Sequence, residues 1–173
     1  MTTAKAKTIQ STTAESPRVF FEKIVINAGV GRLSQQGNFE EKILPQIKRD
    51  LATLSGQAAE PRPATKSIAG FKMREGQIVG LRITLRGRKM VDFFKRLTMI
   101  VLPRVKDFRG IELKAVDSHG ILSIGLREQL VFPEINPEDS VLIFPLQVIL
   151  VPKGRSREAA LKIYRDLGVP LKR

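Results

Sequence analysis

Apolar and polar positions along the chain form two kinds of pattern, and the first is typical of β-strands. The run VFFEKIVIN, residues 19–27, is rich in β-branched and aromatic residues and leads into a glycine turn at residues 28–31, which predicts a strand that ends there. Residues 81–86 alternate strictly, so a second predicted strand has one apolar face and one polar face. The apolar face carries Leu81, Ile83 and Leu85, and the polar face carries Arg82, Thr84 and Arg86.

The second kind of pattern is helical. Apolar residues recur at helical spacing over residues 39–54, between a predicted capping pair formed by Asn38 with the glutamate three residues on and a left-handed C-terminal cap at Gly56. Pro45 conflicts with a continuous helix, because proline removes a hydrogen bond and clashes with the preceding turn. Either the helix kinks at Pro45 or its regular part begins at Leu44.

The second half of the chain adds a hairpin and two more helices. Ser118, His119 and Gly120 are common turn residues between two apolar runs, which predicts a β-hairpin. Ser156 is a good N-terminal cap for the last helix. The predicted elements are a helix over 88–102 that Pro103 ends, hairpin strands over 111–117 and 121–129, a strand over 146–151 and a helix up to Leu167.

This order of elements predicts the fold class. A hairpin in the second half favours an α+β fold over a doubly wound parallel one. We therefore expect an antiparallel β-sheet with helices packed on one face, in a single domain over residues 18–173. Residues 1–17 are rich in Ser, Thr and Ala, so we expect a flexible polar tail there.

The distribution of charge indicates a polyanionic partner. The 173-residue chain has 30 Lys and Arg against 17 Asp and Glu, a net charge of +13. Residues 62–109 hold 13 of the basic residues and 3 of the acidic ones, whereas residues 110–152 hold 2 and 6. A merely solvated face would carry acids among its bases, so the basic block favours nucleic acid.

Composition also excludes several kinds of chemistry. Without Cys the chain has no disulfide, thiolate nucleophile or cysteine-based zinc site, and one His makes no His-rich metal site. We therefore expect no cofactor. The longest apolar run, residues 141–151, is shorter than the roughly 18 residues that a membrane span needs and is broken by Pro145 and Gln147, so we expect an intracellular protein with no membrane partner.

Known enzyme motifs are incomplete. Residues 29–31 lack the third glycine of a dinucleotide-binding fingerprint, and residues 70–76 lack the Gly-Lys-Ser/Thr of a Walker loop. His119 fits an ordinary turn better than the base of a catalytic triad. A metal-dependent RNA-processing enzyme stays as an alternative only if carboxylates from distant segments converge, because none of these has diagnostic spacing: Asp92, Asp107, Glu112 and Asp117.

Aromatic residues stand inside the basic block. Phe71 lies between Lys66 and Lys72, and Phe108 lies within the basic run of residues 104–109. An aromatic side chain in a cationic loop either stacks on an unpaired base or anchors its loop on the core. The spacing alone leaves both interpretations open.

Polar groups on the predicted sheet favour RNA over DNA. Arg82 and Thr84 share the polar face of their strand, and Asn27 ends the first strand, so guanidinium, hydroxyl and amide groups meet on one surface. Such a surface suits irregular RNA better than a duplex groove, because RNA loops present splayed bases and 2′-hydroxyls. The sequence therefore predicts an RNA-binding domain.

Long ordered blocks of the sequence resemble a known family. They lie within residues 18–168 and are EKIVINAGVG (22–31), LSGQ (54–57), TKSIAGFKMREGQIVGLRITLRG (65–87), FFKRL (93–97), LPRVKDFRG (102–110) and GLREQLVFPEI (125–135). On these blocks the chain resembles the bacterial-type large-subunit ribosomal protein numbered five, which binds 5S rRNA in the central protuberance. The antiparallel sheet of that family, with helices on one side, agrees with the fold expected above.

The resemblance implies a structural, non-catalytic protein of the cytoplasmic or an organellar ribosome. The implied partners are 5S rRNA, 23S rRNA, P-site tRNA, neighbouring central-protuberance proteins and a small-subunit head protein. The implied rRNA-binding residues are Asn27, Gln57, Lys66, Phe71, Arg82, Thr84 and Arg86. Residues 70–80 resemble the mobile basic loop of the family, with Phe71 at its root and with implied tRNA contacts from Lys72, Met73, Arg74 and Gln77.

Three segments depart from the family pattern. A polar tail replaces a longer helical start, and residues 118–121 and 145–147 differ from the usual Gly-Asn turn and Gly-Met-Asp strand. These differences leave the main RNA surface intact. A free RNA chaperone is the alternative among binding proteins.

Overall fold

The described residues begin in a short helix. The computed structural model describes residues 17–140, 142–154 and 156–172. Of the expected tail, residues 1–16 lie outside the described residues, and Pro17 opens α1 (Pro17–Phe20). The first strand therefore begins at Phe21 and not at Val19, because proline is well suited to the first turn of a helix.

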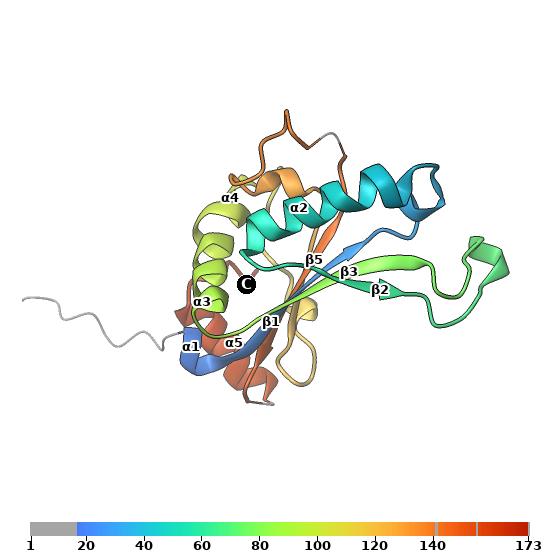
Figure 1. The fold of residues 1–173 in the computed structure, drawn as a ribbon. Helices are drawn as coiled ribbons and strands as arrows, with labels where there is room; N and C mark the ends of the chain where they lie inside the picture. The colour runs from blue at the N-terminus through green and yellow to red at the C-terminus, as the bar shows by residue number, and fades with distance from the viewer. Residues whose placement is uncertain (1–16, 141, 155, 173) are drawn as a thin grey trace, which may run out of the picture.

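One antiparallel sheet of five strands organises the fold, with the strand order β2-β3-β1-β5-β4 (Figure 1). The strands are β1 (Phe21–Gly29), β2 (Glu60–Pro63), β3 (Ile78–Leu85), β4 (Leu122–Leu126) and β5 (Leu146–Pro152). Strand β2 was not predicted because it contains Pro61 and Pro63. Its position at the edge explains why they are tolerated, since an edge strand does not need every backbone donor.

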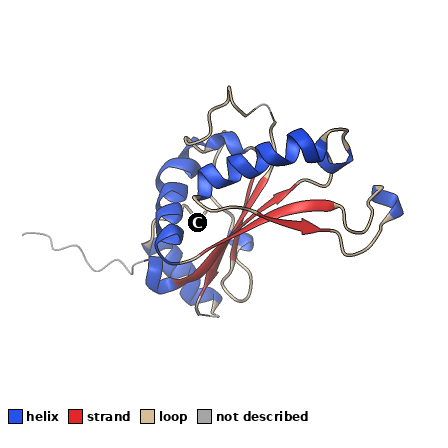
Figure 2. Cartoon of the chain, viewed as in Figure 1, coloured by secondary structure: helices blue, strands red, loops and turns tan. Residues whose placement is uncertain are grey.

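The register places the apolar side chains of all the long strands on one face. Ile26 of β1 pairs with Ile83 of β3 and with Val148 of β5, which in turn pairs with Ile124 of β4, and all four are buried. The predicted apolar face of Leu81, Ile83 and Leu85 is confirmed. These side chains form a single core with the helices that cover that face, so the predicted α+β class is confirmed (Figure 2).

Four α-helices follow α1 in the described residues: α2 (Leu44–Ser55), α3 (Gly87–Arg96), α4 (Leu102–Arg104) and α5 (Arg157–Asp166). None is long and apolar enough to cross a membrane. Helix α2 begins at Leu44 with Pro45 in its first turn, where a missing N–H costs no hydrogen bond. Gly56 caps its C-terminus at φ +67° as predicted.

Two details of the predicted helices are wrong. Asn38 directly precedes a π-helical turn, Phe39–Ile43, but its backbone is left-handed (φ +63°) and not extended as in an N-cap, and its side chain makes no cap hydrogen bond. Pro103 does not end a helix over 88–102 but lies inside α4, after a second π-helical turn, Leu97–Val101. The wider hydrogen-bond spacing of a π turn accommodates a residue that has no N–H.

Of the predicted hairpin around residues 118–120, the turn forms, since Asp117 N donates to the Ile121 oxygen at 3.0 Å, but residues 111–117 form no strand. Strand β4 pairs with β5, while residues 113–115 form a 3₁₀ turn and Val116 makes only an isolated bridge to Leu122. Helix α5 holds the segment before the turn, since the Arg157 guanidinium donates to the backbone oxygens of Val116 and Leu113 at 3.2 and 3.1 Å. The turn itself is tied down by Asp117, whose Oδ1 accepts the backbone N–H of His119 at 2.8 Å.

Candidate RNA interface

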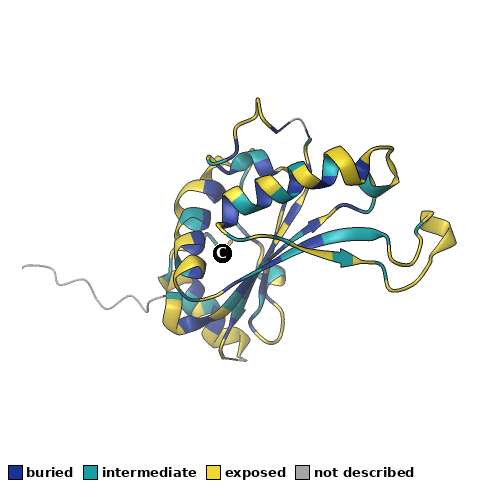
Figure 3. Ribbon diagram, in the orientation of Figure 1, coloured by how far each residue is buried: buried dark blue, intermediate teal, exposed yellow. Residues whose placement is uncertain are grey.

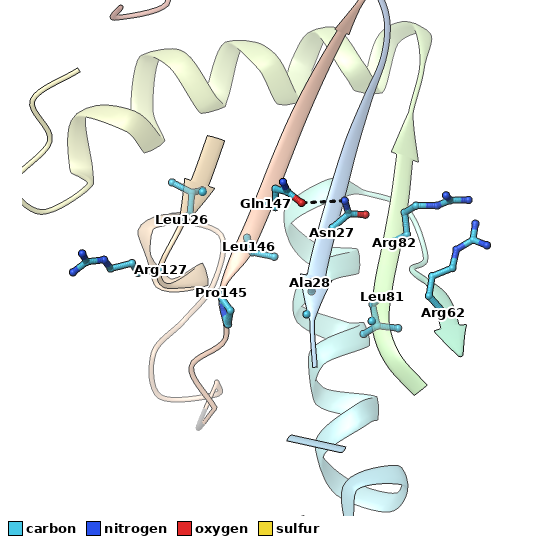
Figure 4. A pocket seen from close by; sticks show the side chains of 13 residues that line it. Asn27, Ala28, Arg62, Leu81, Arg82, Leu126, Arg127, Pro145, Leu146 and Gln147 are labelled. Atoms are coloured by element: carbon cyan, nitrogen blue, oxygen red, sulfur yellow. Dashed lines mark hydrogen bonds between the residues drawn. The ribbon is translucent and has the colours of Figure 1, made fainter. Parts of the chain in front are cut away.

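A row of polar side chains crosses the face of the sheet that the helices leave open. Asn27 of β1 pairs in register with Arg82 of β3 on one side and with Gln147 of β5 on the other, and Gly125 of β4 ends the row. Asn27 Nδ2 donates to Gln147 Oε1 at 3.4 Å (Figure 4). The predicted meeting of Asn27 and Arg82 on one surface is therefore confirmed by the strand register.

A hollow of about 550 Å³, here called the sheet hollow, lies over this row. Its lining includes Asn27 and Gln147 between arginines of β2, of β3 and of the bend after β4, and Figure 4 shows Arg62 and Arg82 on one side and Arg127 on the other. Gly29 and Gly80 pair with each other at the β1–β3 end, so the backbone there carries no side chain over it. The amide groups can form hydrogen bonds with RNA bases, and the guanidinium groups around them can bind RNA phosphates.

The arginines of the sheet hollow are only partly neutralised. Glu60 Oε2 lies 2.7 Å from Arg62 Nη2 and 3.6 Å from Arg82 Nη2, so one carboxylate serves two guanidinium groups. Arg127 has no ion pair with any other residue that the structure describes. Exposed ion pairs are worth about 0–1 kcal/mol, so these arginines stay available to a polyanion.

Three more predicted residues lie beside this face. Thr84 is half-buried two residues from Arg82 on the same side of β3, and Gln57 Nε2 donates to its backbone oxygen at 3.3 Å. Arg86 stands after the end of β3, where its Nη1 lies 3.4 Å from Glu22 Oε1 and so is shared with a carboxylate. The structure therefore gathers Asn27, Gln57, Arg82, Thr84 and Arg86 on and around the open face.

The remaining predicted residues lie away from that face, in the connection between β2 and β3. This connection, residues 64–77, projects from the body of the molecule and is largely exposed (Figures 1 and 3). It will be called the hairpin tip. It carries Lys66, Phe71, Lys72, Met73, Arg74 and Gln77.

The expected boundaries of the basic loop need correction. Residues 78–80 belong to β3, because Ile78 and Gly80 pair with β2, so the loop is not 70–80. Phe71 is not at the root of the loop but in its terminal turn, between the bridged residues Ile68 and Met73, and it is 67% exposed. It therefore does not anchor the loop on the core, whereas the half-buried Phe108 does pack against the core.

Hydrogen bonds hold the hairpin tip to the segment after β1. Gln35 Nε2 donates to the Phe71 backbone oxygen at 2.7 Å. Gln77 Nε2 donates to Ser34 Oγ at 2.9 Å, so the Gln77 side chain serves the base of the tip rather than its outer surface. The mobility of this segment stays a prediction.

The open face contains functional candidates that the sequence did not single out. Arg62 comes from the unpredicted edge strand, and Gln147 and Arg127 come from the other side of the sheet. The sequence contained one indication of Gln147, because it is a polar residue in an otherwise apolar strand. The carboxylates of the enzyme alternative gain no support, because no three His, Cys, Asp or Glu side chains gather into a metal-binding group within the described residues.

Comparison with known proteins identifies the class to which this interface belongs. Residues 15–74 match the family model described as ribosomal protein L5, and residues 78–171 match the model that describes the C-terminus of the same ribosomal family. The relatives are proteins of the large ribosomal subunit, so the chain is a ribosomal protein and not an enzyme. Within that class, it belongs to the ribosomal protein L5 family.

The similarity extends over most of the chain. The large ribosomal subunit protein uL5 of Rubrobacter xylanophilus is 43% identical over 151 residues, 87% of this chain and 82% of the relative. The uL5 proteins of Anaeromyxobacter sp. (strain K) and Oceanobacillus iheyensis are each 42% identical, over 91% and 92% of this chain and 84% and 86% of the relatives. The chain is thus a bacterial-type structural constituent of the large subunit, part of the ribosome in the cytoplasm.

Proposed function

We propose that the open face of the sheet binds 5S rRNA and that the protein thereby helps to build the central protuberance of the large subunit. The observation that carries the proposal is the row of Asn27, Arg82 and Gln147 across the face that the described helices leave open. Amide groups recognise base edges of unpaired nucleotides, and arginines contact phosphates. In this assembly the further partners are 23S rRNA, neighbouring central-protuberance proteins and a head protein of the small subunit.

Binding should be selective for 5S rRNA over an equally long duplex and should weaken steeply with salt. If about five phosphates are neutralised, the log–log salt slope is on the order of −3 to −5, at roughly 0.7–0.9 per contact. A filter-binding titration at several salt concentrations measures both quantities. A slope near zero, or equal affinity for the duplex, contradicts the proposal.

Removing polar groups from the open face should weaken RNA binding without unfolding the protein. Asn27→Ala or Thr84→Ala should cost about 1–3 kcal/mol of 5S rRNA binding, because hydrogen-bonding groups of the RNA lose their partners. The thermal midpoint should change little, since both side chains point away from the core. Thr53→Ala is the matched control, as Thr53 is an exposed polar residue of helix α2, outside the open face. Equal losses for all three variants refute a localised site.

The hairpin tip is proposed to contact P-site tRNA, through Lys72 and Arg74 in particular. Both side chains are exposed near the outer end of a segment that projects from the body. A separate location from the open face means that the two activities can be separated by mutation.

Lys72→Ala together with Arg74→Ala should leave 5S rRNA affinity within a few fold but impair large subunits that carry P-site tRNA. Binding assays with 5S rRNA and tRNA-binding assays on reconstituted subunits measure the two effects. The separation fails if this double variant loses 5S rRNA binding as fully as Asn27→Ala with Thr84→Ala, because the hairpin tip then belongs to the primary RNA surface.

A further inference from the structure

A second hollow adjoins the sheet hollow at the β4 edge of the sheet. It has a volume of about 720 Å³ and lies between residues 104–110 and the segment 125–131, and it will be called the edge hollow. Its volume falls in the range of roughly 300–1,000 Å³ that is typical of ligand sites. The two hollows share Gly125, Leu126 and Arg127.

Unpaired positive charge dominates the edge hollow. Arg104, Lys106, Arg109 and Arg127 line it, and none of them forms an ion pair with another described residue. Lys172 also lines it but lies 3.5 Å from Glu112. Two acidic side chains, Asp107 and Glu128, are present, so the cations outnumber the acids.

The remaining lining is apolar and includes an aromatic ring. Phe108 is half-buried, and Val105, Leu130 and Val131 are partly buried around the same hollow. The loop that carries Phe108 is fixed at its end, because Ile111 N donates to the Pro170 oxygen at 2.8 Å and Lys172 N donates to the Ile111 oxygen at 2.8 Å. A fixed apolar wall beside unpaired cations suits a nucleotide, whose base stacks while its phosphate is neutralised.

The passage between the hollows runs past a residue without a side chain. Gly125 ends the polar row on the open face and lines both hollows, and a Cβ built on it meets no atom within 4 Å. Arg127 follows two residues later, and Figure 4 shows its side chain pointing away from Asn27 and Gln147. A strand of RNA on the open face therefore has a path over β4 toward further cations.

We propose that the edge hollow is a second part of the RNA-binding surface, in which an unpaired strand of the RNA held on the open face continues past Gly125 and is bound by Arg104, Lys106 and Arg109. This inference rests on the proposed function of the open face.

Charge substitutions confined to the edge hollow test the proposal. Arg104→Gln with Arg109→Gln should weaken 5S rRNA binding roughly ten-fold and make the log–log salt slope shallower by about 1.4, because each phosphate contact with single-stranded RNA contributes about 0.7. The matched control is Lys162→Gln with Arg165→Gln, two exposed cations of α5 that line neither hollow. The control variant should bind 5S rRNA with the same log–log salt slope as the unmutated protein.

A neutral substitution tests the path itself. Gly125→Val should weaken 5S rRNA binding about ten-fold by filling the passage, while the thermal midpoint should change little because a Cβ at this position meets no atom within 4 Å and valine suits a strand. Gly154→Val is the matched control, because a Cβ on Gly154 also meets no atom within 4 Å and Gly154 lines neither hollow; it should leave the affinity within two-fold.

The outcomes separate this inference from the function on which it rests. If Asn27→Ala weakens binding while the Arg104/Arg109 pair behaves like the α5 pair, the open face binds RNA and the edge-hollow inference is overturned. If Asn27→Ala, Thr84→Ala and the Arg104/Arg109 pair all bind 5S rRNA like the original protein, the proposed function itself fails. A salt slope reduced equally by both charge pairs shows an effect of net charge alone and also overturns the inference.

Discussion

Ile83→Ala is expected to lower the free energy of unfolding by about 2–5 kcal/mol, because it leaves a cavity in a core that cannot fully collapse around it. Ile83 is 1% exposed in the middle of β3 and pairs with the buried Ile26 of β1. Thr84, the next residue, faces the other side of the sheet, so Thr84→Ala should change the stability far less. Urea unfolding followed by circular dichroism measures both values.

The pair of variants tests the strand register as well as the core. Ile83→Val is the graded control and should cost about 0.5–1.5 kcal/mol, since only one methylene is lost. The effects on RNA binding should run in the opposite order, with Thr84→Ala the more damaging of the two alanine variants. Exchanged effects would mean that β3 is inverted, with Arg82 and Thr84 in the core.

Gly120→Ala is expected to destabilise the protein by a similar amount. Gly120 has φ +79°, and a Cβ there would lie 2.7 Å from the Ala160 Cβ and 3.1 Å from the Ser156 oxygen at the start of α5. The left-handed backbone costs an L-residue about 1–2 kcal/mol and overpacking adds about 1–3 kcal/mol, which predicts a loss of about 2–5 kcal/mol. The Tyr164 hydroxyl donates to the Gly120 oxygen at 2.8 Å, so a shifted turn also disturbs a buried hydrogen bond.

Two other glycines separate the backbone cost from the packing cost. Gly168 has φ +81° but open space around its Cβ position, so Gly168→Ala should cost only the backbone part, about 1–2 kcal/mol. Gly154 has neither a positive φ nor a neighbour within 4 Å, and Gly154→Ala should be nearly neutral. Denaturant midpoints for the three variants give the series. A loss for Gly120→Ala no larger than that for Gly168→Ala would contradict the close contact with α5.

Sequence alone determined the elements whose signals are local. The alternation of residues 81–86 identified the buried side of β3, since side chains of a strand point to opposite faces in turn. Gly56 predicted the end of α2 and Ser156 the start of α5, because both kinds of cap involve only the backbone of the same helix end. In the structure, Ser156 Oγ accepts the Ala159 N–H at 3.5 Å. The concentration of charge in residues 62–109 likewise needed no structure to indicate a nucleic-acid partner.

Tertiary structure decided which segments meet. Residues 111–117 and 121–129 look like a hairpin in sequence, yet the first segment makes only the Val116–Leu122 bridge to β4, because α5 holds it by hydrogen bonds that no local pattern encodes. The unpredicted edge strand β2 brings Arg62 to Arg82, and the β1–β5 register brings Gln147 to Asn27 across 120 positions of the chain. The residues of the open face were thus partly predictable one by one. Their assembly into a site depends on long-range strand pairing, which is set by the packing of the whole core and not by neighbouring residues.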